Sequence, residues 1–191
     1  MNKKPIILAS ASPRRREILT LGSVPFEVCP ASDETAPTGL APEELVRALA
    51  RSKATQVAAK YADRVILGAV TMVVLDGVMV GKPKSPEHAV DMLMKLQGRE
   101  HQVMTGVWCI RTNEDKISVK EDGFTDIATV KFYPMTYEEA AEYVETGEST
   151  DKAGAYGIQG YGMRFVEGIH GDFYTVMGLP AGRLLRFLRD F

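Results

Sequence analysis

Short apolar runs rich in β-branched residues alternate along this chain with segments of helical periodicity, which restricts the fold to sheets covered by helices. The first run, residues 5–10, ends in small residues, and Pro13 then begins a predicted helix that reaches about Leu21. Proline at the first helical position loses no hydrogen bond, Ser12 before it is a good N-cap, and Gly22 ends the helix. The chain therefore begins with a strand that leads directly into a helix.

The same alternation continues to the C-terminus. Strands are predicted over residues 25–29, 64–69, 71–80, 101–119 with a polar turn at 112–115, and 126–133. Helices are predicted over residues 42–61, 85–98, 136–147 and from Leu179 onward, while the glycine-rich residues 154–178 predict strands and tight loops. No repeat or linker interrupts the pattern, so we expect one α/β domain over residues 1–191.

Local signals fix three of these boundaries. Asp76-Gly77 between apolar runs predicts a type I′ hairpin, which needs positive φ at both positions. Ser85 precedes Pro86 as a predicted N-cap, and Thr136 with Glu139 forms a predicted capping box. Because hairpins occur beside strand–helix units, we expect a mixed sheet.

Composition excludes several classes of protein. The net charge of −2 and the dispersed basic residues argue against a broad nucleic-acid-binding face. Two cysteines, Cys29 and Cys109, cannot form a disulfide framework and are interpreted as buried free thiols. No apolar stretch has membrane-spanning length, and the first apolar run is too short for a signal peptide. We expect a cytoplasmic protein without membrane or nucleic-acid partners.

Three consecutive arginines, Arg14, Arg15 and Arg16, lie in the first turn of the first predicted helix. The helix dipole disfavours cations there, whereas the free N–H groups of that turn attract anions. The run is interpreted either as a phosphate site or as three side chains that point into solvent. A Walker loop is excluded, because no glycine-rich run with Gly-Lys-Ser/Thr follows the strand.

Other candidates are weaker when each is taken alone. Asp33 and Glu34 lie in a predicted loop, where carboxylates bind magnesium or are simply solvated. Lys53 lies in an alanine-rich helix, and Lys82 follows the predicted hairpin. The three histidines, at positions 88, 101 and 170, have no metal-ligand spacing and are expected at the surface or supporting a site.

Together these segments closely resemble the Maf family, and the resemblance covers nearly the whole chain in register. Its opening signature is residues 7–19, ILASASPRRREIL, and its most specific segment is residues 151–160, DKAGAYGIQG. Further matches are Asp33-Glu34, Lys53-Ala54, Gly81-Lys82-Pro83, Leu96 to Gly98, His101 to Val107, Gly147-Glu148 and Val176 to Pro180.

The resemblance implies a Maf/Ham1 (ITPase-like) fold: a mixed, curved sheet with flanking helices and two lobes around a central cleft, usually in a homodimer. It implies a nucleoside-triphosphate pyrophosphatase, which releases a monophosphate and pyrophosphate. One branch of the family acts on dTTP, UTP and modified pyrimidine triphosphates, and another on 7-methyl-GTP. The Ser-Pro-Arg-Arg form here, with Thr71 and Gln159, is similar to the pyrimidine branch.

The resemblance also implies roles for individual residues. The positions of Arg14, Thr71 and Gln159 select the base, and those of Ser10, Arg15, Lys53 and Lys82 hold the triphosphate. Glu34 matches the residue that helps to bind the divalent cation, for which Mg²⁺ or Mn²⁺ is expected. Cationic side chains from separate segments suit a triphosphate, and a glutamine can both donate to and accept from a pyrimidine edge.

Position 70 departs from the family pattern. Gly68-Ala69 is normally followed by Asp-Thr, and here Val70 precedes Thr71. The family's aspartate accepts the proton of the attacking water, and valine can neither accept a proton nor bind a metal. Losing a general base typically lowers the rate about 10²–10⁴-fold. The chain is therefore interpreted as an impaired pyrophosphatase, or alternatively as a weak or inactive nucleotide-binding protein linked to septum formation or cell-division control.

Overall fold

The computed structural model describes residues 4–32, 35 and 37–191, and Asp33 and Glu34 lie outside the described residues. The α-helices are α1 (Pro13–Leu21), α2 (Pro42–Ala58), α3 (Pro86–Leu96), α4 (Tyr137–Glu145), α5 (Phe173–Met177) and α6 (Ala181–Phe187). The strands are β1 (Ile6–Leu8), β2 (Phe26–Val28), β3 (Val65–Leu75), β4 (Val78–Val80), β5 (Glu100–Thr112), β6 (Ser118–Phe132) and β7 (Val166–His170). Short 3₁₀ helices are η1 (Ala153–Ala155), η2 (Gly160–Phe165) and η3 (Leu188–Asp190).

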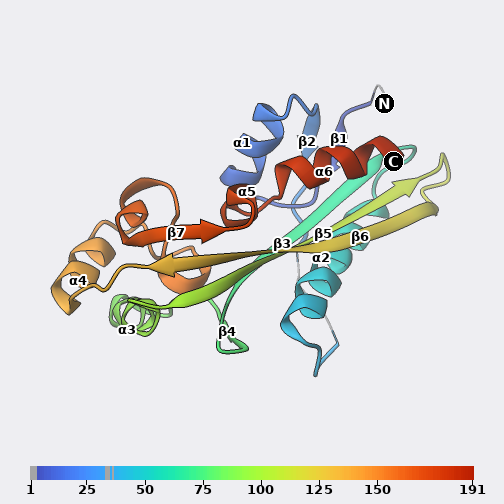
Figure 1. The fold of residues 1–191 in the computed structure, drawn as a ribbon. Helices are drawn as coiled ribbons and strands as arrows, with labels where there is room; N and C mark the ends of the chain where they lie inside the picture. The colour runs from blue at the N-terminus through green and yellow to red at the C-terminus, as the bar shows by residue number, and fades with distance from the viewer. Residues whose placement is uncertain (1–3, 33–34, 36) are drawn as a thin grey trace. The chain divides into compact units, whose positions relative to one another are not determined.

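The strands form a mixed sheet in the order β2-β1-β3-β5-β6-β7, with β4 paired to β3 (Figure 1). Strand β1 runs parallel to β2 and β3, whereas the β3–β4 and β6–β7 pairs are antiparallel. The predicted α/β class and mixed sheet with flanking helices are therefore confirmed.

Two compact units make up the described chain, and each is discontinuous in sequence. Unit 1 contains residues 1–70, 105–126 and 178–191, and unit 2 contains residues 71–104 and 127–177. Strands β3, β5 and β6 each contribute residues to both units. The predicted single domain and its cleft between lobes stay predictions.

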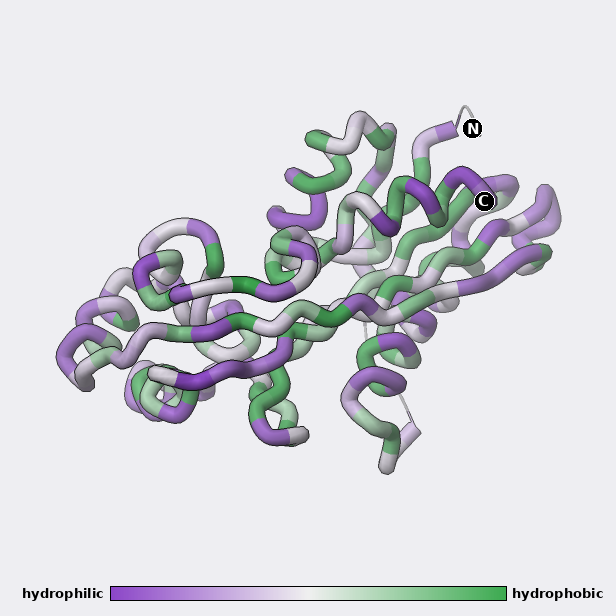
Figure 2. Tube along the Cα trace, in the orientation of Figure 1, coloured by the Kyte–Doolittle hydropathy of each residue, from purple (hydrophilic) through white to green (hydrophobic). Residues whose placement is uncertain are grey.

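In unit 1, helix α2 covers one face of the strands. Its apolar side chains pack with Ile7, Ile66 and Ile110 from β1, β3 and β5. The helix lies very close to the sheet, because a Cβ on Gly68 would be 2.1 Å from the Ala50 carbonyl oxygen. Figure 2 shows the corresponding pattern along α2, where hydrophobic and hydrophilic residues alternate around the helix. Small residues at the contact thus let the backbone of α2 rest on the sheet.

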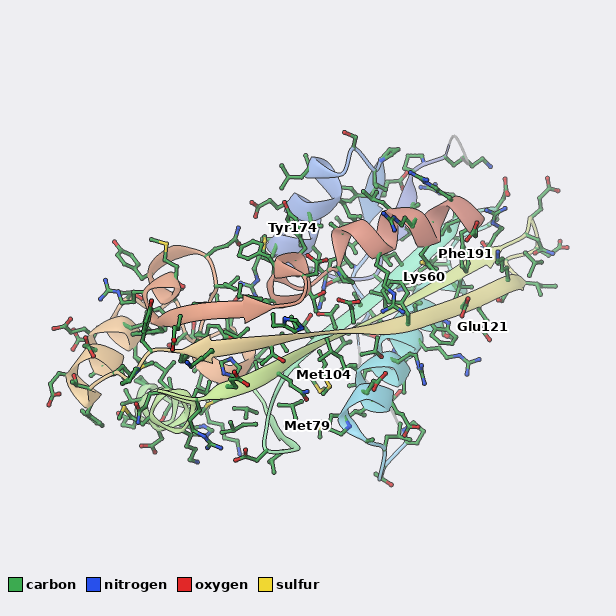
Figure 3. All side chains as sticks on the ribbon, viewed as in Figure 1. Lys60, Met79, Met104, Glu121, Tyr174 and Phe191 are labelled. Atoms are coloured by element: carbon green, nitrogen blue, oxygen red, sulfur yellow. The ribbon has the colours of Figure 1, made fainter. Side chains whose placement is uncertain are left out.

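Helices α1 and α6 pack against each other, also within unit 1. Leu19 and Leu184 are buried, and a Cβ on Gly22 would lie 3.5 Å from Leu185. At the C-terminus, the Lys120 ammonium lies 4.7 Å from the centroid of the Phe191 ring, which is labelled in Figure 3.

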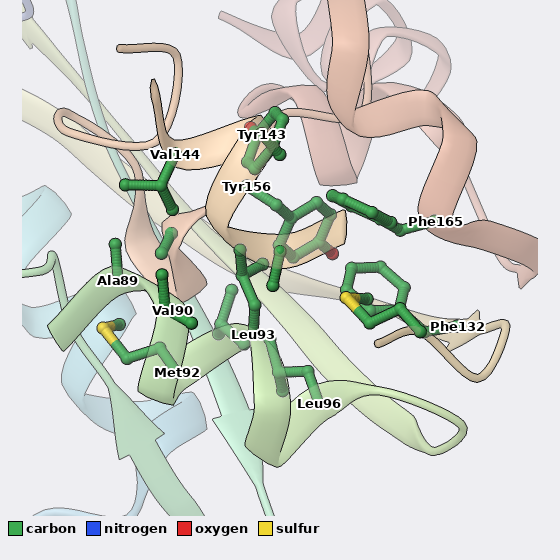
Figure 4. Close-up of a cluster of buried hydrophobic side chains, with 14 of the residues drawn as sticks. Ala89, Val90, Met92, Leu93, Leu96, Phe132, Tyr143, Val144, Tyr156 and Phe165 are labelled. Carbon is green, nitrogen blue, oxygen red and sulfur yellow. The ribbon is translucent and has the colours of Figure 1, made fainter. Parts of the chain in front are cut away.

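Unit 2 has its own apolar core between α3, α4 and the strands (Figure 4). The inward side of α3 contributes Leu93 and Leu96, both fully buried. Aromatic rings pack edge to face, with centroids 4.7 Å apart for Phe132 and Tyr156. The core fixes the segment from η1 to η2, in which Gln159 lies.

Most predicted boundaries are confirmed. Asp76 and Gly77 have φ of 51° and 77°, and Val78 pairs with Leu75 as the hairpin requires. Ser85 accepts a hydrogen bond from the His88 N–H at 3.2 Å, and both bonds of the Thr136–Glu139 capping box are present.

Other predictions are wrong in informative ways. Strand β3 continues through Val70, where we predicted a break, because valine suits a strand. Strand β6 spans residues 118–132 without a gap, since its charged residues 120–122 lie on an exposed part of the strand. Helix α5 was missed because it is only five residues long, between Gly171 and Gly178, both with positive φ.

Three single-residue expectations also need correction. The Ser12 side chain makes no capping bond. The backbone N–H of Ser12 donates to Ser10 Oγ at 3.3 Å. Cys29 is only half-buried, whereas Cys109 is buried as expected, and both are free thiols. His101 is buried, at 3% exposure, so it does not lie at the surface, and the alternative expectation that it supports a site stays a prediction.

Candidate functional site

The N-terminus of α1 holds Arg15 in a fixed position. Only 8% of Arg15 is exposed, and its guanidinium donates to Ser10 Oγ at 2.8 Å and to the Gly178 carbonyl at 2.9 Å. Neither acceptor carries a charge, and the two bonds orient the guanidinium. Ser10 is itself 5% exposed, at the end of the segment that follows β1. The structure thus joins two of the predicted phosphate-binding residues directly.

The other two arginines of the run differ from Arg15 in exposure. Arg14 is half-buried and Arg16 is exposed. The interpretation that all three point into solvent is therefore wrong for Arg15. The missing side-chain cap at Ser12 leaves the first-turn N–H groups of α1 without that partner, which suits an anion.

Lys53 and Val70 lie in unit 1 on neighbouring elements. Side chains alternate along a strand, so Val70 lies on the same side of β3 as Gly68, the side that contacts α2. Lys53 is half-buried on α2, between the residues that contact Gly68. Val70 is 6% exposed, and a side chain that buried has little access to water. The structure places no proton acceptor at position 70.

Thr71 and Lys82 belong to unit 2, where Thr71 is half-buried and Lys82 is exposed. The segment of Lys82 is fixed to η1, because the Gly154 N–H donates to the Gly81 carbonyl at 3.0 Å. Gly154 has a φ of 73°, and a Cβ there would lie 2.9 Å from Val73. The two segments that the resemblance singles out, Gly81-Lys82-Pro83 and residues 151–160, therefore lie side by side.

Gln159 is half-buried at the start of η2, also in unit 2. Its amide forms no hydrogen bond within the described part of the chain, so its donor and acceptor are both available to a ligand. The loop around it is held by Glu148, a residue that sequence reasoning passed over. Its only signal was its place in the Gly147-Glu148 match to the family.

The described residues do not form a metal site by themselves. Among residues 4–32, 35 and 37–191, no group of three or more His, Cys, Asp or Glu side chains could hold a metal ion. Asp33 and Glu34, the predicted metal-binding acids, lie outside this set. Within the same residues, no helix is long and apolar enough to cross a membrane.

The arrangement suits the binding of an anion. A buried guanidinium and a helix N-terminus occur together in unit 1, and both attract phosphate. An amide with unused hydrogen-bonding groups lies in unit 2. The structure thus describes the position of each of these groups within its own unit.

Comparisons with known proteins cover almost the full chain. A family model described as "Maf-like protein" matches residues 5–191. A dTTP/UTP pyrophosphatase of Bacillus velezensis is 45% identical over 189 residues, which is 98% of this chain and 97% of the relative. The dTTP/UTP pyrophosphatases of Clostridioides difficile and Aquifex aeolicus are each 46% identical, over 97% of this chain and 94% of their own lengths.

Among solved structures, the Staphylococcus aureus Ham1 protein matches at 16% identity with a TM-score of 0.44, over 68% of this chain and 72% of its own. The family model and the relatives about 45% identical match this chain in sequence over nearly its whole length. On these grounds the chain belongs to the Maf family.

Proposed function

We propose that this chain binds pyrimidine nucleoside triphosphates, dTTP or UTP and their modified forms, and hydrolyses them slowly to the monophosphate and pyrophosphate. The names of relatives 45–46% identical support the activity and the substrate class. The observation that carries the proposal is the buried Arg15 guanidinium, bonded to Ser10 at the N-terminus of α1.

The geometry of Arg15 suits a triphosphate better than a neutral ligand. A buried cation loses hydration, and it regains favourable interactions when an anion binds beside it. Two of its hydrogen bonds fix the plane of the guanidinium, so the cation has a defined orientation. A preorganised cation of this kind holds phosphate oxygens and offsets the charge that develops on them during reaction.

The proposed reaction breaks the bond between the α phosphorus and the oxygen that bridges it to the β phosphorus. The oxygen of a water molecule forms the new bond to the α phosphorus, pyrophosphate leaves, and one proton of the water passes to solvent, because Val70 cannot accept it. Ser10, Arg15, Lys53 and Lys82 would bind the charged groups. Arg14, Thr71 and Gln159 would select the base, and the Gln159 amide has unused hydrogen-bonding groups for it.

A divalent cation, Mg²⁺ or Mn²⁺, belongs to the proposal as the partner of Glu34. When bound, such an ion offsets negative charge on the phosphates. We further propose a homodimer, which the resemblance supports, and a cytoplasmic location, which the two free thiols support.

A second candidate, nucleotide binding without hydrolysis, is favoured by the burial of Val70. Its side chain is 6% exposed on the side of β3 that faces α2, and it cannot accept the proton. In this case the phosphate-binding residues remain and the chemistry is lost.

Pyrophosphate release from dTTP, UTP and 7-methyl-GTP, with Mg²⁺ or Mn²⁺, separates the two candidates. The unmodified chain is compared with Val70→Asp. Val70→Asn serves as a matched control, because asparagine has nearly the shape of aspartate without its charge. We expect Val70→Asp to hydrolyse the pyrimidine triphosphates about 10²–10⁴-fold faster than the unmodified chain, because it gains a general base.

Each result has a defined meaning. Weak turnover in the unmodified chain supports the enzyme, and turnover only in Val70→Asp supports the binding protein. Equal rates for the unmodified chain and Val70→Asp would show that position 70 does not supply the base. A preference for 7-methyl-GTP, or no nucleotide binding at all, contradicts the proposed substrate class.

A further inference from the structure

The carboxylate of Glu148 lies at the centre of the loop that carries Gln159. Its Oε1 accepts from the Tyr143 hydroxyl at 3.1 Å and from the Gly162 N–H at 3.3 Å. Its Oε2 accepts from the Tyr161 N–H at 2.9 Å. One side chain therefore holds the residues that directly follow Gln159.

The residues before Gln159 are held by the same group through Tyr143. The Tyr143 hydroxyl accepts from the Gly157 N–H at 3.0 Å while it donates to Glu148. Tyr143 is 1% exposed in the core of unit 2, so this bond ties the loop to a rigid part of the structure. Both ends of residues 157–162 thus depend on one carboxylate.

The backbone of Glu148 is also held in place. The Lys152 ammonium donates to the Glu148 carbonyl at 2.5 Å and to Asp151 at 2.7 Å, and the Lys152 side chain is 14% exposed. This contact holds the Glu148 backbone, so the side chain that carries the carboxylate begins from a fixed backbone position.

The loop closes tightly around the carboxylate, and two glycines lie where it does so. A Cβ on Gly157 would lie 2.7 Å from Glu148 Oε1, and one on Gly160 would lie 2.6 Å from Oε2. Gly160 also has a φ of 71°, which L side chains rarely adopt. The glycines on both sides of Gln159 therefore fit the carboxylate and leave Gln159 as the polar side chain between them.

We propose that Glu148 is a positioning residue for base recognition: its carboxylate holds residues 157–162 so that the Gln159 amide meets the pyrimidine edge. This inference rests on the proposed function and extends it to a residue that does not touch the substrate. Glu148 is expected to act on base recognition, since the contacts of its carboxylate lie in the loop of Gln159.

Binding of two probes in the presence of Mg²⁺ tests the inference without requiring turnover. The first probe is α,β-methylene-dTTP, which has a base, and the second is tripolyphosphate, which has none. We expect Glu148→Gln to weaken binding of α,β-methylene-dTTP by on the order of tenfold, as for the loss of a hydrogen bond or two. Its affinity for tripolyphosphate should not change. Glu139→Gln removes a carboxylate from α4 of the same unit and should alter neither affinity.

A double-mutant cycle shows whether Glu148 acts through Gln159. In a Gln159→Ala background, Glu148→Gln should cause no further loss, because the group that it positions is already absent. Tyr143→Phe keeps the buried ring and removes one bond to the carboxylate, so it should weaken the base-containing probe in the same direction. If Glu148→Gln does not fold, Tyr143→Phe is measured in its place.

Two results overturn the inference while the proposed function stands. In the first, the variants bind α,β-methylene-dTTP as well as the unmodified chain does. In the second, they lose affinity equally for both probes, which would indicate a purely structural role. If the unmodified chain binds neither probe, the proposed function fails, and this inference fails with it.

Discussion

At the residue scale, His101 is a titratable group buried among aromatic rings. It is 3% exposed, its Nε2 lies 2.7 Å from the Tyr156 hydroxyl, and its ring packs edge-on against Phe132 with centroids 4.8 Å apart. Its Nδ1 has no hydrogen-bond partner among the described residues. Burial disfavours the charged imidazolium and lowers the pKa of His101 from 6.5 to about 4.

We expect this burial to make the protein less stable in mild acid. Between pH 6.5 and about 4, the unfolded chain takes up a proton at His101 that the folded chain does not. Stability is therefore complete well above pH 6.5 and falls as the pH is lowered, by about 1 kcal/mol at pH 5.5 and about 3 kcal/mol at pH 4. Urea unfolding at several pH values measures the loss.

The contribution of His101 is isolated by substitution. His101→Gln should remove this part of the pH dependence, whereas His170→Gln, at an exposed position, should retain it. If the unmodified chain and His101→Gln lose stability in parallel, other groups cause the acid sensitivity and the lowered pKa of His101 is wrong.

At the scale of elements, the close contact of α2 with β3 and β5 depends on two glycines. A Cβ on Gly68 would lie 2.1 Å from the Ala50 carbonyl oxygen, and one on Gly106 would lie 2.3 Å from the Val46 carbonyl oxygen. Both obstacles are backbone atoms and cannot rotate away. We expect Gly68→Ala to lower the free energy of unfolding by about 2 kcal/mol or more, as overpacking does.

Gly182 supplies the matched control. It is exposed in α6, nothing lies within 4 Å of its virtual Cβ, and its backbone is helical. Gly182→Ala should therefore raise the free energy of unfolding by about 0.5–1 kcal/mol through the gain in helix propensity. Chemical unfolding of both variants checks the prediction, which fails if Gly68→Ala is neutral.

Elements with local signals could be predicted from the sequence, and elements without them could not. The Asp76-Gly77 hairpin and the Thr136 capping box depend on a few adjacent residues, so their patterns were sufficient. Residues 120–125 of β6 carry little alternation, and their strand depends on pairing within the sheet. Helix α5 is a single short turn whose limits are set by glycine conformations that many loops share.

The candidate site divides in the same way. Arg14–Arg16 were identifiable because cations at a helix N-terminus are unfavourable without a ligand. The burial of Arg15 and its bonds to Ser10 and Gly178 were not, because Gly178 is 163 residues away in the sequence. The role of Glu148 was not identifiable either, because its bonds to Tyr143, Tyr161 and Gly162 depend on the conformation of the loop between them.

At the scale of the whole molecule, charge is too small to guide an anion from a distance. The net charge is −2, so a triphosphate gains nothing from the overall field and must be held by local cations. Of the candidate residues, Ser10, Arg15 and Lys53 lie in unit 1, and Lys82 and Gln159 lie in unit 2. A ligand that binds only the folded chain stabilises it, so binding should be visible as a change in the stability of the folded chain.

We expect α,β-methylene-dTTP with Mg²⁺ to raise the melting temperature, because a ligand that binds only the folded state adds RT ln(1 + [L]/Kd). At 100 times Kd this is about 2.7 kcal/mol, or roughly 5–10 °C for a chain of this size. Arg15→Lys loses the fork that bonds Ser10 and Gly178, so its shift should be much smaller. Arg16→Lys, at an exposed position of the same helix, should retain the full shift. Equal shifts in the two variants would show that the buried guanidinium does not bind the phosphates.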